Sequence, residues 1–240
     1  MKHFTGKTLV FGGCLALAAA CLVSCSSLES KSKTVVLFDG KSLDGWQYAL
    51  ADASVSRDKV WSVEDGILKC KGDPIGVLYK GPDVSDFDLE VEYRWAPGQK
   101  PGNSGIFSRI EQPVTAVPRA IEVQLQHGNA GDVMGLQGKP VAAAQLRSFA
   151  IKGHPVAGDI SGVKKTQDAE KPPGEWNKVF IQARGSVYTV YMNGKLVNQA
   201  QGVDLTRGPV GVQSEGGEIH YRRVAVTPFA RQGSQFVASR

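Results

Sequence analysis

One extended stretch of the sequence, residues 121–128, carries polar side chains that could act on a sugar. Side chains of a β-strand alternate between two faces, so Glu122, Gln124 and Gln126 should share one face, with the apolar residues between them on the other. A carboxylate can remove a proton, and amides can hold hydroxyl groups. His127 follows as a second residue able to accept a proton. The alternative is a solvated outer face, because such a row is costly to bury without partners.

A neighbouring stretch, residues 103–109, adds an aromatic ring and a guanidinium group. Phe107 and Arg109 are two residues apart, so an extended backbone would place them on the same side. Arginine binds carbonyl or carboxylate oxygens through a planar fork, and an aromatic ring suits the apolar C–H face of a pyranose. The two stretches together predict a sugar site. The alternative for Arg109 is a surface arginine whose stem rests on Phe107.

The rest of the chain predicts the strands that would position these residues. Of the 240 residues, 28 are Gly and 12 are Pro, and short alternating segments are separated by turn-forming residues. This pattern favours a single all-β sandwich over a helical bundle. Asn193-Gly194 predicts a tight hairpin, because both positions of that turn need positive φ. Strands are expected at 34–38, 61–63, 67–71, 76–79, 87–95, 104–109, 120–126, 176–184, 187–192, 195–199, 208–213 and 218–227.

The folded domain is expected to span residues 34–228, followed by a tail at 229–240. Segment 139–174 is polar and flanked by prolines, which predicts a long insertion of the kind that often helps to build a site on a sandwich. Cys70 lies in an alternating segment with no local histidine or helix start to activate it, so we expect a buried core thiol.

Residues 1–24 are expected to be a lipoprotein signal peptide. Lys2 and Lys7 precede an uncharged apolar stretch of about 15 residues, which is short for a membrane span. Leu22-Val-Ser-Cys25 resembles a bacterial lipobox, which would make Cys25 the lipidated first residue of the mature chain, with residues 26–33 as a polar tether. The resemblance implies anchoring in the bacterial cell envelope, at the outer membrane. An ordinary secretory signal and a weaker site ending at Cys21 are the alternatives.

Charge argues against a nucleic-acid partner. The chain has 28 Lys and Arg against 23 Asp and Glu, and two of the lysines lie in the expected signal. Binding to phosphate backbones needs a concentrated basic face, and the sequence has no dense basic run. The expected partners are therefore a carbohydrate and, through Cys25, a membrane.

Ordered blocks of sequence point to a family. They include Gly102-Asn-Ser-Gly-Ile-Phe107 and Ile121-Glu-Val-Gln124, together with blocks at 37–46, 61–68, 86–94, 171–177, 191–194 and 211–213. Over residues 35–228 the sequence resembles the 3-keto-disaccharide hydrolase family, also named for 3-keto-glucoside 1,2-lyase and 3-keto-2-hydroxyglucal hydratase activity. The resemblance implies a concanavalin A-like, two-sheet jelly roll acting on oxidised glucosides. Many members carry Gln-Asp-His-Gly where this chain has Gln213-Ser-Glu-Gly216, so no role is assigned to residues 214 and 215.

The chemistry of an oxidised sugar fits the polar row better than that of an ordinary glucanase. Acetal hydrolysis needs two carboxylates, whereas the strand at 121–126 supplies only Glu122. A carbonyl at C3 acidifies the hydrogen on C2, so a single base can start β-elimination of the group at C1. We expect Glu122 or His127 to be the base and Arg109 to polarise the carbonyl. The substrate-binding set is expected to comprise Asn103, Phe107, Gln124, Gln126 and Gln213.

A divalent metal is left open as a cofactor. His127, Glu122 and Asp132 could supply mixed nitrogen and oxygen ligands, but their spacing is not that of a strong metal motif. Two other function classes also stay open: a non-catalytic, lectin-like carbohydrate-binding protein, because the same fold serves both roles, and a passive envelope lipoprotein. The expected reaction is β-elimination, hydration or both in sequence, with net hydrolysis of the glycoside.

Overall fold

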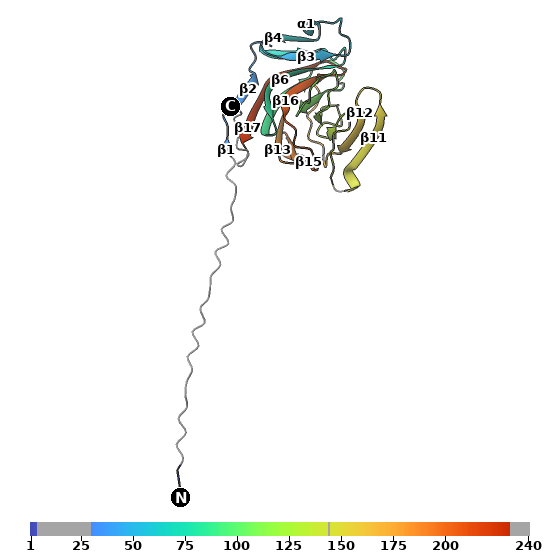
Figure 1. Ribbon diagram of the computed structural model, residues 1–240. Helices are drawn as coiled ribbons and strands as arrows, with labels where there is room; N and C mark the ends of the chain where they lie inside the picture. Colours follow the sequence, from blue (N-terminus) through green and yellow to red (C-terminus); the bar gives the residue numbers. More distant parts are fainter. Residues whose placement is uncertain (4–29, 144, 231–240) are drawn as a thin grey trace, which may run out of the picture.

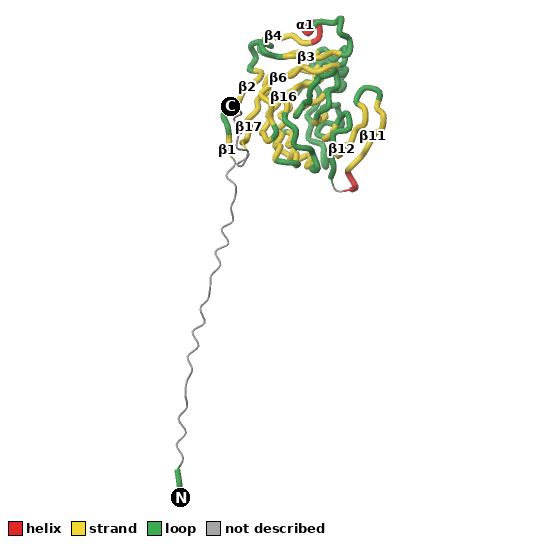
Figure 2. The backbone as a smooth tube through the Cα atoms, in the orientation of Figure 1, coloured by secondary structure: helices red, strands yellow, loops and turns green. Residues whose placement is uncertain are grey.

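The computed structural model describes residues 1–3, 30–143 and 145–230. The strands between Ser30 and Ala230 form a sandwich of two antiparallel sheets (Figures 1 and 2). The expected all-β jelly roll is confirmed. Helix is confined in the described residues to the short α1 (Arg57–Val60) and the single 3-10 turn Gln145–Arg147. No helix in this part of the chain combines the length and apolar character that crossing a membrane requires. The expected lipobox, residues 22–25, lies outside the described residues.

The first sheet has nine strands and is centred on two long ones, β7 and β17. Two strands near the N-terminus, β1 (Ser30–Lys31) and β2 (Val35–Phe38), pair with β17 beside the main path. The path itself runs through β15 (Lys195–Ala200), β14 (Val187–Met192), β13 (Asn177–Arg184), β7 (Asp86–Trp95), β17 (Ile219–Ala230), β5 (Ile67–Cys70) and β4 (Trp61–Glu64).

The second sheet has eight strands and carries the polar row predicted from the sequence. Its strand order brings β9 and β8 side by side near the middle, although a loop separates them in the chain. The order is β11 (Ser148–His154), β12 (Gly158–Val163), β10 (Val133–Gly135), β9 (Ile121–Gln124), β8 (Gly105–Ser108), β16 (Gly208–Ser214), β6 (Gly76–Val84) and β3 (Gln47–Leu50).

Three expectations about connections and strand ends can be compared with the structure. The turn between β14 and β15 has Asn193 at φ 52° and Gly194 at φ 80°, so the predicted hairpin is confirmed. Segment 139–174, expected to be a long insertion, contains the hairpin β11–β12, which extends the second sheet at its edge (Figure 1). Strand β17 continues to Ala230, beyond the expected end at 227, because its last residues pair with β7 and β1.

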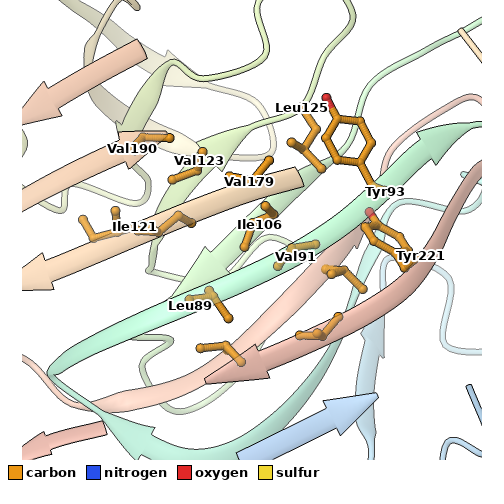
Figure 3. Packing of buried hydrophobic residues seen from close by; sticks show 14 of the residues in the cluster. Leu89, Val91, Tyr93, Ile106, Ile121, Val123, Leu125, Val179, Val190 and Tyr221 are labelled. Carbon is orange, nitrogen blue, oxygen red and sulfur yellow. The ribbon is translucent and has the colours of Figure 1, made fainter. Parts of the chain in front are cut away.

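The core lies between the two sheets and takes the apolar residue at every second strand position. Val91 and Tyr93 of β7 face Ile106 of β8 and Val123 of β9 across it (Figure 3). Cys70 is also fully buried there, and desolvation raises its pKa to about 11. The expectation of an inert core thiol is confirmed, since a thiol with that pKa stays protonated at neutral pH.

Arg109 is a buried structural residue that connects three backbone segments. Its guanidinium group is fully buried and donates to the backbone carbonyls of Ser85 (2.6 and 3.0 Å), Gly185 (2.8 Å) and Asp204. Arg109 has φ 51°, which breaks the alternation directly after β8 and turns its side chain away from that of Phe107. This placement corrects the expectation that Arg109 polarises a substrate carbonyl, and it corrects the surface alternative as well.

We predict that Arg109→Lys lowers the free energy of unfolding by about 3 kcal/mol, because an ammonium group cannot reproduce the fork that ties three carbonyls together. Urea denaturation would measure this. Arg207→Lys is the matched control: Arg207 is exposed and donates to the carbonyl of Asp83, so its effect should stay within about 0.5 kcal/mol. Equal stability of the two variants would contradict the structural role.

Candidate functional site

A pocket of about 240 Å³ opens on the outer face of the second sheet, the face directed away from the core. Its polar lining comes from the strands and loops at the middle of the sheet, and its apolar lining comes largely from the hairpin β11–β12. The polar residues include Asn103, Glu122, Gln124, Gln126, Asn129, Asp132, Lys164, Gln213 and Glu215.

The alternation predicted for strand β9 is confirmed. Val123 and its apolar neighbours lie in the core, whereas Glu122 and Gln124 line the pocket. Glu122 is 2% exposed and Gln124 is 8% exposed, so the alternative of a solvated outer face is wrong. Gln126 also lines the pocket, but it lies past the end of β9, is exposed, and accepts a hydrogen bond from Asn129 (2.7 Å).

Gly105 makes room for the Glu122 carboxyl group. Gly105 lies on β8 directly opposite Gln124, two positions along from Phe107, the partner of Glu122. A Cβ added to Gly105 would overlap Glu122 Oε1. The carboxyl group therefore lies over the bare backbone of the neighbouring strand, and only glycine leaves that space open.

Three buried oxygens of the pocket have no hydrogen-bond partner among the described residues. They are Oε1 of Glu122, Oδ1 of Asn103 and Oε1 of Gln213. Leaving a buried acceptor unsatisfied costs about 1–3 kcal/mol, so folded proteins rarely keep several together without a ligand or water to bind them. All three atoms suit the hydroxyl donors of a sugar.

Burial and a second carboxylate both act on Glu122. Desolvation raises the pKa of Glu122 well above its usual value, and the charge of Glu215 raises it further. Glu215 is half-buried, and desolvation raises its own pKa against the opposing effect of a hydrogen bond from Gln213. A proton is therefore held on this pair more tightly than on solvated carboxylates.

Glu215 is the site residue that sequence reasoning missed. Strand β9 supplies one acid, as expected, and the chain leaving β16 adds Glu215 to the lining of the same pocket. The signal was present, because Glu215 follows Gln213 by two residues and should share its face. The chain departs from the family pattern at residues 214 and 215, so the resemblance implies no role for Glu215.

Asp132 is a third acid of the pocket, but its charge is already compensated. Its carboxylate accepts hydrogen bonds from Nζ of Lys164 (2.8 Å) and the backbone N–H of Lys165 (2.8 Å). Asp132 therefore orders the loop after β9 and the end of β12, and it leaves Glu122 and Glu215 as the pair available for proton transfer.

His127 does not line the pocket. It is exposed, and its Nδ1 lies 2.9 Å from Oε2 of Glu170. Glu170 also accepts hydrogen bonds from Tyr93 (2.9 Å) and Trp95 (3.1 Å), so His127 completes a structural network beside the first sheet. Strand β9 ends at Gln124 and a tight turn follows, which directs His127 away from Glu122. This placement corrects the expectation of His127 as a candidate base.

Phe107 lies beside the pocket and does not line it. It is fully buried, lies directly opposite Glu122, and packs in an apolar cluster with Met134 and Leu136. The expectation that its ring faces a bound sugar is therefore wrong. The aromatic side chain that lines the pocket is Phe149 of β11, which covers Gly162 and lies 4.7 Å from Nζ of Lys164. Sequence reasoning treated that segment as an insertion without strands.

The residues considered for a metal are not gathered together. Glu122 and Asp132 line the pocket, but His127 is bound to Glu170 outside it. Within the described ranges, no group of three or more His, Cys, Asp and Glu side chains is arranged to hold a metal ion.

We predict that Glu122→Gln stabilises the protein at alkaline pH. The pKa of Glu122 is raised in the folded state, so this residue favours folding at pH values below its unfolded pKa, and that contribution is lost as pH rises through the folded pKa. A glutamine removes the penalty of ionising a buried group. Urea unfolding from pH 4 to 9 should show an advantage of the variant that grows with pH, whereas an advantage that grows towards acid would contradict the assignment.

Comparisons with known proteins identify the family of the chain. The family model described as the 3-keto-alpha-glucoside-1,2-lyase-like domain matches residues 33–227. A search of curated proteins found no match.

Similar solved structures include two proteins from Parabacteroides distasonis that carry provisional assignments as glycosyl hydrolases. One has a TM-score of 0.56 at 18% identity, covering 80% of this chain and 92% of its own. The other has a TM-score of 0.55 at 23% identity, covering 82% and 99%. The carbohydrate-binding module CBM66 from Bacillus subtilis has a TM-score of 0.52 at 14% identity, covering 75% and 93%. These likenesses show a shared fold, and because the family model spans most of the sequence, the chain belongs to the 3-keto-alpha-glucoside-1,2-lyase-like family.

Proposed function

We propose that this protein is an enzyme that cleaves 3-keto-glucosides, beginning with removal of the proton on C2. The observation that carries the proposal is the buried carboxyl of Glu122, which has an unpartnered oxygen and a raised pKa in a pocket lined by amides. Membership of the family and the glycosyl hydrolase assignments of similar structures support a carbohydrate substrate.

Glu122 performs the proton transfer in this account. The ionised carboxylate takes the C2 proton, the electron pair of that bond forms the C1–C2 double bond, and the C1–oxygen bond breaks. The departing oxygen leaves with the proton that Glu122 then returns. The products are the free aglycone and a 2-hydroxy-3-keto-glucal, and addition of water across the double bond gives net hydrolysis. Because its pKa is raised, the ionised form of Glu122 is a stronger base than a solvated carboxylate.

The amides of the pocket hold the oxidised ring. Asn103 and Gln213 present acceptor oxygens that sugar hydroxyls would satisfy. Gln124 is fixed differently, because its Oε1 accepts hydrogen bonds from the backbone N–H groups of Leu125 (2.9 Å) and Gln126 (2.8 Å). This directs the NH₂ group of Gln124, a donor, towards other partners, including the oxygen of a bound carbonyl.

A second candidate function is direct hydrolysis of an unoxidised glycoside. The pocket holds Glu122 and Glu215 together, and acetal hydrolysis uses a pair of carboxyl groups with separated pKa values. Sugar binding without catalysis is the third, and the likeness to a carbohydrate-binding module favours it. The three candidates differ in which sugar is cleaved and in which acids are needed.

We predict that the wild-type protein releases the aglycone from a 3-keto-glucoside but not from the matching unoxidised glucoside, as followed by NMR. Glu122→Gln should reduce kcat/KM by about 10²-fold or more, because it removes the base without changing its shape. Glu175→Gln, at an exposed position away from the pocket, is the control and should leave the rate unchanged.

Two other results of the same experiment would contradict the proposal. Release from the unoxidised glucoside that requires both Glu122 and Glu215 would establish direct hydrolysis. Saturable binding of both sugars with no turnover would establish the non-catalytic protein.

The proposed localisation is a lipid anchor at Cys25 in the bacterial cell envelope, facing carbohydrate outside the cytoplasm. The support is the Leu22–Cys25 sequence alone. We predict that radiolabelled palmitate enters the wild-type protein and that Cys25→Ala abolishes labelling, because Cys25 is the residue that the expected lipobox acylates. Cys21→Ala is the matched control and should still be labelled, whereas label retained in Cys25→Ala would overturn the anchor.

A further inference from the structure

The outer face of the second sheet changes from polar to apolar along the direction of its strands. Glu122 lies at the level of Met134 on β10, and Met134 pairs with Gly162 on β12. Two residues further towards one end, Gln124 lies beside the Asp132–Lys164 ion pair. The polar end of the pocket therefore begins immediately on one side of Glu122.

The opposite side of Glu122 is apolar over several strands. Leu136 follows Met134 by two residues, and its backbone bonds to that of Ala120, which precedes β9. Ile160 lies two residues before Gly162 and pairs with Ile151 on the edge strand β11. All of these side chains except that of Ala120 line the pocket. Glu122 is thus the last polar group of the floor before an apolar end begins.

The apolar end is open to a ligand. Ile151 is 43% exposed and Val156 is 42% exposed, although both line the pocket. The ring of Phe149 forms the wall beside these two residues. The ring lies directly over Gly162, and a side chain at position 162 would overlap the ring. The hairpin β11–β12 thus presents an accessible apolar surface to the pocket.

Few hydrogen-bonding groups are available at this end. His154 is the polar residue of the hairpin that lines the pocket, and its Nδ1 accepts from the backbone N–H groups of Val156 (3.4 Å) and Ala157 (3.1 Å). A second sugar placed here would lose water from its hydroxyl groups without gaining partners, whereas an aryl or alkyl group would gain from burial.

We infer that the leaving group of the substrate is an apolar aglycone, aryl or alkyl, and not a second sugar. The inference rests on the proposed function, because elimination starts at C2 and breaks the adjacent bond at C1. If Glu122 acts at C2, the scissile bond lies at the boundary between the two ends of the pocket. The oxidised ring then occupies the amide-lined end, and the leaving group occupies the surface formed by Leu136, Phe149, Ile151, Val156 and Ile160.

The test compares equilibrium binding of two oxidised substrates to Glu122→Gln, which binds without turnover. Titration calorimetry with a phenyl 3-keto-glucoside and with a 3-keto-disaccharide whose leaving group is glucose should show phenyl bound at least about 10-fold more tightly. Adding Ile151→Ser and Val156→Ser should reduce that preference about 10-fold. Adding Leu196→Ser instead, at a position 45% exposed on β15 and outside the pocket, should leave it unchanged.

Equal or tighter binding of the disaccharide would overturn the inference, and so would a phenyl preference that survives the two serine substitutions. Turnover of both substrates by the wild-type protein reports separately on the proposed function. If neither is cleaved, the proposed elimination fails, while the binding ratio still decides which chemical group the apolar end accepts.

Discussion

The Glu122 carboxyl group lies buried on the outer face of a sheet, above the backbone of Gly105, with one oxygen unpartnered in the described part of the chain. Water would solvate this group better than the protein does, so folding carries a free-energy cost here that packing between the sheets must offset. Phe107 and Met134 flank it on the two neighbouring strands as apolar partners. A carboxyl group in such surroundings keeps its proton to higher pH, which is the property that proton transfer near neutral pH requires.

Strand β9 links this site to the stability of the fold. Its four residues, Ile121–Gln124, are all buried, alternately in the core and in the pocket. A shift of one residue in its pairing with β8 would exchange Val123 for Glu122 in the core, so the core fixes the register of the site. The hairpin β11–β12 then adds the wall that turns one end of this face into a pocket with an apolar side.

The sequence predicted those features that depend on local geometry. Alternation placed Glu122 and Gln124 opposite Val123, and the positive-φ preference of Asn193-Gly194 predicted the hairpin after β14. Predictions from alternation were wrong where a strand ends earlier than the alternating sequence pattern does. Arg109 has left-handed backbone angles directly after β8, so its side chain leaves the face that periodicity assigned to it. His127 lies in a turn after β9, which carries it away from Glu122.

Other features of the site depend on contacts between segments far apart in the chain. Phe149 reaches the pocket because β11 pairs with β12, which pairs with β10, and no local pattern specifies that order. Burial raises the pKa of Glu122, and the charge of Glu215 raises it further. Glu215 follows a strand that is separated from β9 by most of the second half of the domain. Sequence patterns give residue faces within a strand, whereas strand order and long-range charge come from the tertiary fold.

The claim that Glu122 removes the proton on C2 is tested most directly by hydrogen exchange. A 3-keto-C-glucoside would be incubated with the protein in D₂O, and the hydrogen on C2 would be followed by NMR. The carbon-linked group at C1 of this compound cannot be eliminated, so only proton exchange is observed. We expect the wild-type protein to exchange the C2 hydrogen faster than buffer does, and Glu122→Gln to exchange it no faster than buffer. Exchange that persists undiminished in Glu122→Gln would contradict the role of this residue as the base.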